Sequence, residues 1–161
     1  LLEYGAKAYE DHKKGLCTYE VEQVILAIVV TTGIASIFLT KDYTPDYNSG
    51  LAHAIFYALT SYPVIEKNHL HGEIVGFGVL LALLVDGQDE EFEKIYLLNK
   101  SISLPVSLDE IEISKEQWEE STDRIPDMSD VAHYPYKVTK EMLKNAMARL
   151  EEKVRKDNHV R

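Results

Sequence analysis

The stretches LAHAIFYALTS, residues 51–61, and GEIVGFGVLLALLV, residues 72–85, decide the fold. Each stretch is apolar on more than one face. A helix that is hydrophobic all round lies in the interior of a protein. The sequence therefore predicts two interior helices, Leu51–Ser61 and Gly72–Val85, joined by the loop SYPVIEKNHLH.

Helical patterns continue on both sides of this pair. One pattern ends at Gly15, and another begins near Thr18, whose hydroxyl is positioned to cap it. Residues 90–99 form a charged amphipathic pattern, and a last helix starts near Thr139. No segment alternates apolar and polar residues for long enough to require a strand. We therefore predict an all-α helical bundle that forms one domain over residues 1–161.

Capping residues mark some helix starts and are missing at others. Ser107 with Glu110, and Ser114 with Gln117, have the spacing of a capping box, so two short helices are predicted there. Leu1, in contrast, leads directly into a helical pattern with no capping residue before it. That start predicts a helix that has been cut part-way.

The stretch from Val24 to Leu39 is almost wholly apolar. It is shorter than the roughly 20 residues that a membrane span needs. Because it has no polar face, we predict that it is the most buried helix of the bundle. The stretch that follows, residues 40–50 (TKDYTPDYNSG), has the composition of a loop, and such loops often line functional sites.

The composition narrows the class of protein. The 161 residues carry a formal net charge of -10, with a pI near 5.0. This charge repels phosphates and anionic lipids, so neither nucleic acid nor a membrane is expected as a partner. Cys17 is the only cysteine, which excludes a disulfide within the chain and favours a cytoplasmic location.

His53 lies inside the first interior helix, where an unpaired imidazole is costly. Two interpretations of this residue remain open. The ring either bonds to a carbonyl or carboxylate, which the chemistry alone favours, or it binds a metal ion, because neutral imidazole is a common metal ligand.

His71 precedes the second interior helix and is placed to face His53 across a shared pocket. Two imidazoles from separate helices make half of a metal site, but a zinc or iron centre needs at least three protein ligands. The sequence offers no obvious third ligand. We expect His69 to support the site from outside the ligand set or to lie at the surface, and we expect a structural role for His133.

The two histidine motifs carry a resemblance to a known family. SGLAHAIFYALT and HLHGEIVGFGVLLALLVDGQ resemble the C-terminal domain of glycerol dehydrogenases in the iron-containing alcohol dehydrogenase superfamily. The resemblance begins with LLEYGAKAYEDHKKG and continues through SLPVSLDEI and VAHYPYKVTKEML, so it covers nearly the whole chain in order.

This resemblance implies that His53 and His71 ligate a divalent metal, zinc or iron, together with an aspartate. It also implies that the aspartate and the domain that binds NAD precede the region equivalent to Leu1. The complete enzyme would oxidise a polyol or other secondary alcohol, and it would form a homo-oligomer. The chain would supply the metal-binding half and would be inactive alone.

The chain also departs from the family pattern. Family members commonly carry a second histidine and Asn-Gly after the first motif, where this chain has Phe56, Tyr57 and Ala58. Glycerol itself is therefore a less secure expectation than the polyol class. Glu73 could orient a metal ligand or simply favour the start of its helix. A helical remnant that has no catalysis and acts only by association is the alternative function.

Overall fold

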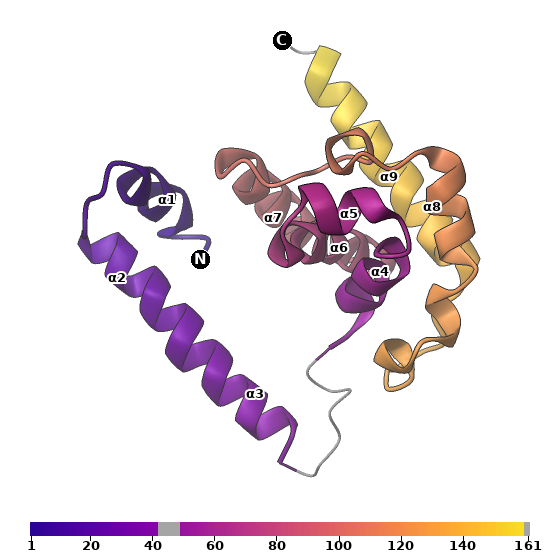
Figure 1. Cartoon of the computed structure of the whole chain (residues 1–161), viewed down its shortest axis with the longest axis horizontal. Helices are drawn as coiled ribbons and strands as arrows, with labels where there is room; N and C mark the ends of the chain where they lie inside the picture. Colours follow the sequence, from indigo (N-terminus) through magenta and orange to yellow (C-terminus); the bar gives the residue numbers. More distant parts are fainter. Residues whose placement is uncertain (42–48, 160–161) are drawn as a thin grey trace.

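The computed structural model describes residues 1–41 and 49–159, and these residues form helices without any strand (Figure 1). The all-α prediction is confirmed. Two parts can be distinguished in Figure 1: a pair of N-terminal helical segments, and a bundle formed by the helices from α4 (Leu51–Leu59) to α9 (Lys140–His159). The bundle holds nearly all of the buried apolar residues.

Helix α6 (His71–Val85) is the centre of the bundle. It packs against α4 (Leu51–Leu59), α7 (Asp89–Ser101) and α9 (Lys140–His159). Contact on several sides explains why the sequence of α6 has no polar face. Burial of each large apolar side chain of α6 stabilises the folded state by roughly 1.5–3 kcal/mol, because the side chain is removed from water. The buried side chains are Ile74, Phe77, Leu80, Leu81 and Leu84.

Helices α4 and α6 approach each other closely at Gly78. A Cβ atom added to Gly78 would lie 2.7 Å from the carbonyl oxygen of Ala52 and 2.9 Å from its Cα. Only glycine fits there, because both neighbouring atoms belong to the backbone. At the other end of the pair, Phe56 contacts His71, so the two helices run in opposite directions.

The segment between these two helices differs from the prediction. Residues 61–71 were expected to be a loop, but they contain the short helix α5 (Pro63–Asn68). Proline at its first position is favourable there, because that residue needs no hydrogen-bond donor. Ile65 of α5 is buried and anchors the segment to the core. The connection is therefore an ordered, packed element.

The C-terminal half wraps around the α4–α6 pair. Ser114 caps α8 (Lys115–Thr122), and its hydroxyl accepts a hydrogen bond from the Gln117 amide at 3.2 Å, which confirms that capping box. The Ser107 box precedes only a 3-10 turn, Asp109–Ile111. Helix α9 is the last helix, as predicted. Two further 3-10 turns link α8 to α9: Ile125–Asp127 and Ser129–Val131.

A side chain from this wrapping segment secures the end of α4. The Arg124 guanidinium donates to the carbonyl oxygen of Ala58 at 3.0 Å and to the hydroxyl of Ser61 at 2.8 Å. The last carbonyl groups of a helix have no partner within the helix. Arg124 supplies one, and a positive charge at this end also favours the helix dipole.

The N-terminal part consists of α1 (Gly5–Lys13) and a 21-residue helix, Tyr19–Leu39, which we call the long helix. The long helix comprises α2 (Tyr19–Leu26), a π-helical stretch (Ala27–Thr32) and α3 (Gly33–Leu39). Thr18 does precede this helix, but its hydroxyl does not cap it. Instead the hydroxyl donates to the buried Asp11 carboxylate of α1 at 2.8 Å.

The prediction that Val24–Leu39 is the most buried helix is wrong. None of its residues is buried, and in Figure 1 the long helix stands apart from the bundle. Its large apolar side chains are exposed; they are Ile25, Leu26, Ile28, Val29, Val30, Ile34, Ile37, Phe38 and Leu39. Apolar composition indicated that this helix would be covered, but no described part of the chain covers it.

The long helix is also longer than the apolar run suggested by the sequence. By length and composition alone, its 21 residues could cross a membrane. Core helices of soluble proteins pass the same test. The predicted loop that follows, residues 40–50, lies largely outside the described residues, which leave out 42–48.

Replacing Gly78 with alanine tests the close approach of α4 and α6. The new methyl group would meet the Ala52 backbone at less than 3 Å. We expect the free energy of unfolding to fall by about 1–3 kcal/mol, because overpacking outweighs the gain in helix propensity.

Urea denaturation measures this change. Gly72→Ala is the matched control, since nothing lies within 4 Å of a Cβ at that position of the same helix. Equal effects of the two substitutions would contradict the close packing at Gly78.

Candidate metal centre

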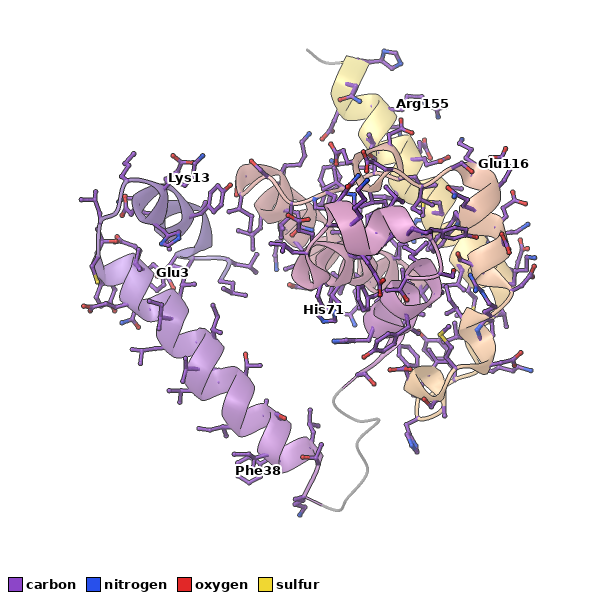
Figure 2. The ribbon with its side chains drawn as sticks, in the orientation of Figure 1. Glu3, Lys13, Phe38, His71, Glu116 and Arg155 are labelled. Carbon is purple, nitrogen blue, oxygen red and sulfur yellow. The ribbon has the colours of Figure 1, made fainter. Side chains whose placement is uncertain are left out.

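His53 and His71 meet at the surface between α4 and α6. Their ring centroids lie 5.6 Å apart, with an angle of 44° between the ring planes. The structure therefore brings together the two residues that the sequence singled out, although they lie on different helices. Figure 2 shows His71 at the edge of the bundle. The site can be reached from solvent, because His71 is exposed and His53 is only partly buried.

Aromatic side chains surround the pair. The Phe56 ring meets the His71 ring edge-on, with centroids 4.4 Å apart and an interplanar angle of 77°. The Tyr57 ring lies 6.4 Å from the His53 ring. Edge-to-face contacts of this kind orient rings and contribute about 0.5–1.5 kcal/mol. The Phe56 ring therefore supports the His71 ring.

The pKa of His53 is lowered from the ordinary value for histidine. Burial is the main cause, because it penalises the charged ring, and the nearby His71 acts in the same direction. The Asp130 carboxylate opposes both by favouring the charged form. His53 is thereby kept neutral near pH 7, which is the form that a metal ion requires.

No side chain or carbonyl group of the described residues forms a hydrogen bond with either imidazole. Of the two interpretations of His53, a bond to a carbonyl or carboxylate is thus not found. The ring nitrogens of both residues are left to solvent or to a ligand. Binding of a metal by His53 and His71 stays a prediction.

A third ligand is not in place. Among residues 1–41 and 49–159, no group of three or more His, Cys, Asp or Glu side chains could hold a metal ion. Asp130 influences the charge of His53 but does not complete such a group. Two imidazoles fit a divalent cation as partial ligands only, since zinc sites use at least three protein ligands.

His69 belongs to a different environment. Its side chain is 11% exposed, with Nδ1 at 3.5 Å from the Glu73 carboxylate and Nε2 at 3.8 Å from that of Glu112. Asn68 donates a hydrogen bond to the same Glu112 carboxylate. These contacts lie at the turn before α6, and the buried Nε2 atom of His69 has no hydrogen-bond partner among the described residues.

Glu73 acts at the start of its helix. Its carboxylate accepts a hydrogen bond from the backbone N–H of Leu70 at 3.0 Å. This bond satisfies one of the amide groups that a helix start leaves without a partner. Of the two roles considered for Glu73, the structure supports helix initiation.

Sequence reasoning missed the residues of the C-terminal half that pack on α4 beside the site. Tyr134 lies 3.9 Å from the position of a Cβ on Gly50, at the start of α4, and burial raises the pKa of its hydroxyl to about 12. Asp130 precedes it in the turn that packs on α4. The aromatic motif AHYPY was the available signal, but it carried no information about its partner helix. His133 of this motif is exposed.

The sequence was compared with known proteins and protein families. No protein-family model matches the sequence. The chain is similar to glycerol dehydrogenase. It is 30% identical to that enzyme from Escherichia coli O6:H1 over 120 residues, which are 72% of this chain and 29% of the enzyme. The chain thus spans less than a third of the length of this relative, and the match supports a glycerol dehydrogenase-like relationship.

The lowered pKa of His53 predicts that the free energy of unfolding depends on pH. A pKa lowered in the folded state means that the unfolded chain binds the proton first as pH falls. The free energy of unfolding should therefore decrease as pH drops below about 6.5, the ordinary value for histidine. NMR titration of the His53 ring should show a midpoint below that value.

Two substitutions should move this midpoint in opposite directions. His71→Gln removes the neighbouring ring that lowers the pKa of His53 and should raise the midpoint, whereas Asp130→Asn removes the carboxylate that raises this pKa and should lower the midpoint. Asp127→Asn serves as the control, because this exposed carboxylate does not act on His53. Shifts of the same sign for both variants would show that the electrostatic account is wrong.

Proposed function

We propose that the chain is the metal-binding half of a glycerol dehydrogenase-like oxidoreductase that uses NAD to oxidise a polyol or other secondary alcohol. The observation that carries this proposal is the pairing of His53 and His71, with centroids 5.6 Å apart, in a chain similar to glycerol dehydrogenase. The reaction transfers hydride from the alcohol carbon to the nicotinamide and releases the hydroxyl proton to water.

In this proposal, His53 and His71 hold a divalent ion, zinc or iron, through one ring nitrogen each. When bound, the ion supplies Lewis-acid stabilisation of the developing alkoxide. A third ligand and the nucleotide site come from a domain outside these residues. A cytoplasmic location and a homo-oligomeric assembly complete the proposal.

The residues around the pair have separate tasks. Burial and the neighbouring His71 both lower the pKa of His53, so its ring nitrogen stays unprotonated and available to a metal ion. Phe56 holds the His71 ring by its edge-on contact. Phe56 and Tyr57 also make one wall of the site aromatic, which favours an alcohol that carries an apolar group beside its hydroxyl.

Titration with zinc tests the ligand assignment directly. Calorimetry should detect weak binding by the chain, because two imidazoles without a carboxylate close the site incompletely. His53→Ala and His71→Ala should each lower the affinity by at least about tenfold.

His159→Ala is the matched control, since this histidine is exposed at the far end of α9. If all three variants bind zinc as the parent chain does, His53 and His71 are not the ligands. Circular dichroism confirms that each variant is folded.

An activity assay tests the proposal that the chain is half of an enzyme. With NAD, glycerol and zinc, the chain alone should produce no NADH, since its sequence has no Gly-rich loop between a strand and a helix to hold the nucleotide. Turnover should appear when a polypeptide carrying the nucleotide-binding half of the related dehydrogenase is added, and His53→Ala should abolish it.

The two alternatives give different results in this assay. Turnover by the chain alone would contradict the division into halves. No turnover under any combination, together with unchanged zinc binding in the histidine variants, would favour an inert helical remnant.

A further inference from the structure

A divalent ion held by His53 and His71 would keep its full charge. An imidazole must be neutral to bind a metal ion, so these two ligands remove none of the positive charge. His71 is also the first residue of α6, and the positive end of a helix dipole opposes a cation. Such a site needs a negative group nearby, because an unbalanced charge in partly buried surroundings is costly.

Asp130 is a carboxylate placed beside this pair. It lies in the 3-10 turn Ser129–Val131, which packs on α4, the helix that carries His53. The turn belongs to the orange segment that follows α8 in Figure 1. Among the described residues, Asp130 is the acidic side chain whose charge acts on His53, and it favours the positively charged form of that ring.

Packing on both sides fixes the place of Asp130. Val131, the next residue, is buried in the hydrophobic core, and Met128 packs against the same core. The Val131 amide donates to the Met128 carbonyl oxygen, and the Tyr134 amide donates to the Val131 carbonyl oxygen, each at 3.2 Å. The Tyr134 ring lies 3.9 Å from the Cβ position of Gly50, just before α4. The backbone that carries Asp130 is therefore held against α4.

The charge of Asp130 acts on a metal ion as it acts on a proton. The energy between two charges is proportional to their product, so a divalent ion gains about twice what a proton gains at the same distance. Both His53 and Asp130 are partly buried, which reduces screening by salt. Because no group of three or more described His, Cys, Asp or Glu side chains could hold a metal ion, Asp130 acts as a charge and not as a ligand.

We propose that the Asp130 carboxylate is the electrostatic partner of the His53–His71 pair, where it balances part of the charge of a bound divalent ion from outside the ligand set. This role rests on the proposed function, because it requires His53 and His71 to be the ligands. It gives the C-terminal segment a part in metal binding, although the two histidine motifs lie in the α4 and α6 sequences.

Zinc titration by calorimetry tests this role. Asp130→Asn keeps the size of the side chain and removes its charge, so the zinc affinity should fall about tenfold, as it does for changes of other groups outside a ligand set. Asp130→Glu retains the charge and should bind zinc nearly as the parent chain does. Asp127→Asn is the matched control, because this exposed carboxylate of the neighbouring turn Ile125–Asp127 does not act on His53.

Two further measurements separate a charge from a ligand. The difference in zinc affinity between the parent chain and Asp130→Asn should shrink as the salt concentration rises from about 0.01 M to 1 M, because salt screens interactions across space. The visible absorption of bound cobalt(II) should be the same in the parent chain and in Asp130→Asn, since the ligands are unchanged. Circular dichroism checks that the variants are folded.

The variants distinguish a failure of this role from a failure of the ligand assignment. If His53→Ala loses zinc binding and Asp130→Asn does not, the role of Asp130 is wrong while the two ligands stand. If neither His53→Ala nor His71→Ala weakens binding, both fail. An equal loss in Asp127→Asn would make the net charge of the chain responsible. A loss in Asp130→Asn that ignores salt and alters the cobalt absorption would make Asp130 a ligand, which contradicts a role across space.

Discussion

The contact between Gly78 and the backbone of Ala52 is the constraint on which the structure depends. It sets how closely α4 approaches α6, and α6 in turn is the helix on which α7 and α9 pack. His53 follows Ala52 on one helix, and His71 lies at the start of the other. The distance between their rings is thus a consequence of how the core is packed, and a change in the core would be felt at the surface site.

Much of the bundle could be predicted because its signals are local. The apolar sequences of α4 and α6 required an interior position, and Ser114 with Gln117 marked a helix start through bonds within one turn. The exposure of the long helix could not be predicted from local signals. Its composition indicated that it should be covered, but composition cannot say whether the cover comes from the same chain. The helix cap predicted at Thr18 is also absent, because the Thr18 hydroxyl donates its hydrogen bond to the buried Asp11 carboxylate instead.

The two histidines of the candidate site could be predicted from the sequence, but their surroundings could not. Imidazoles in apolar surroundings are unusual enough to draw attention to His53, and the second motif supplied His71. The influence of Asp130 on His53 could not be predicted, because Asp130 comes from a distant turn whose packing on α4 leaves no periodic pattern in the sequence. Phe56 was noticed only as a departure from a family pattern. Its edge-on contact with His71 gives that departure a physical meaning.

The antiparallel arrangement of α4 and α6 also has a kinetic consequence. The two helices are close neighbours in the chain, with only α5 between them, so little loop entropy is lost when they associate. Elements joined by short connections tend to form early in folding. The two imidazoles would therefore meet before the C-terminal helices dock.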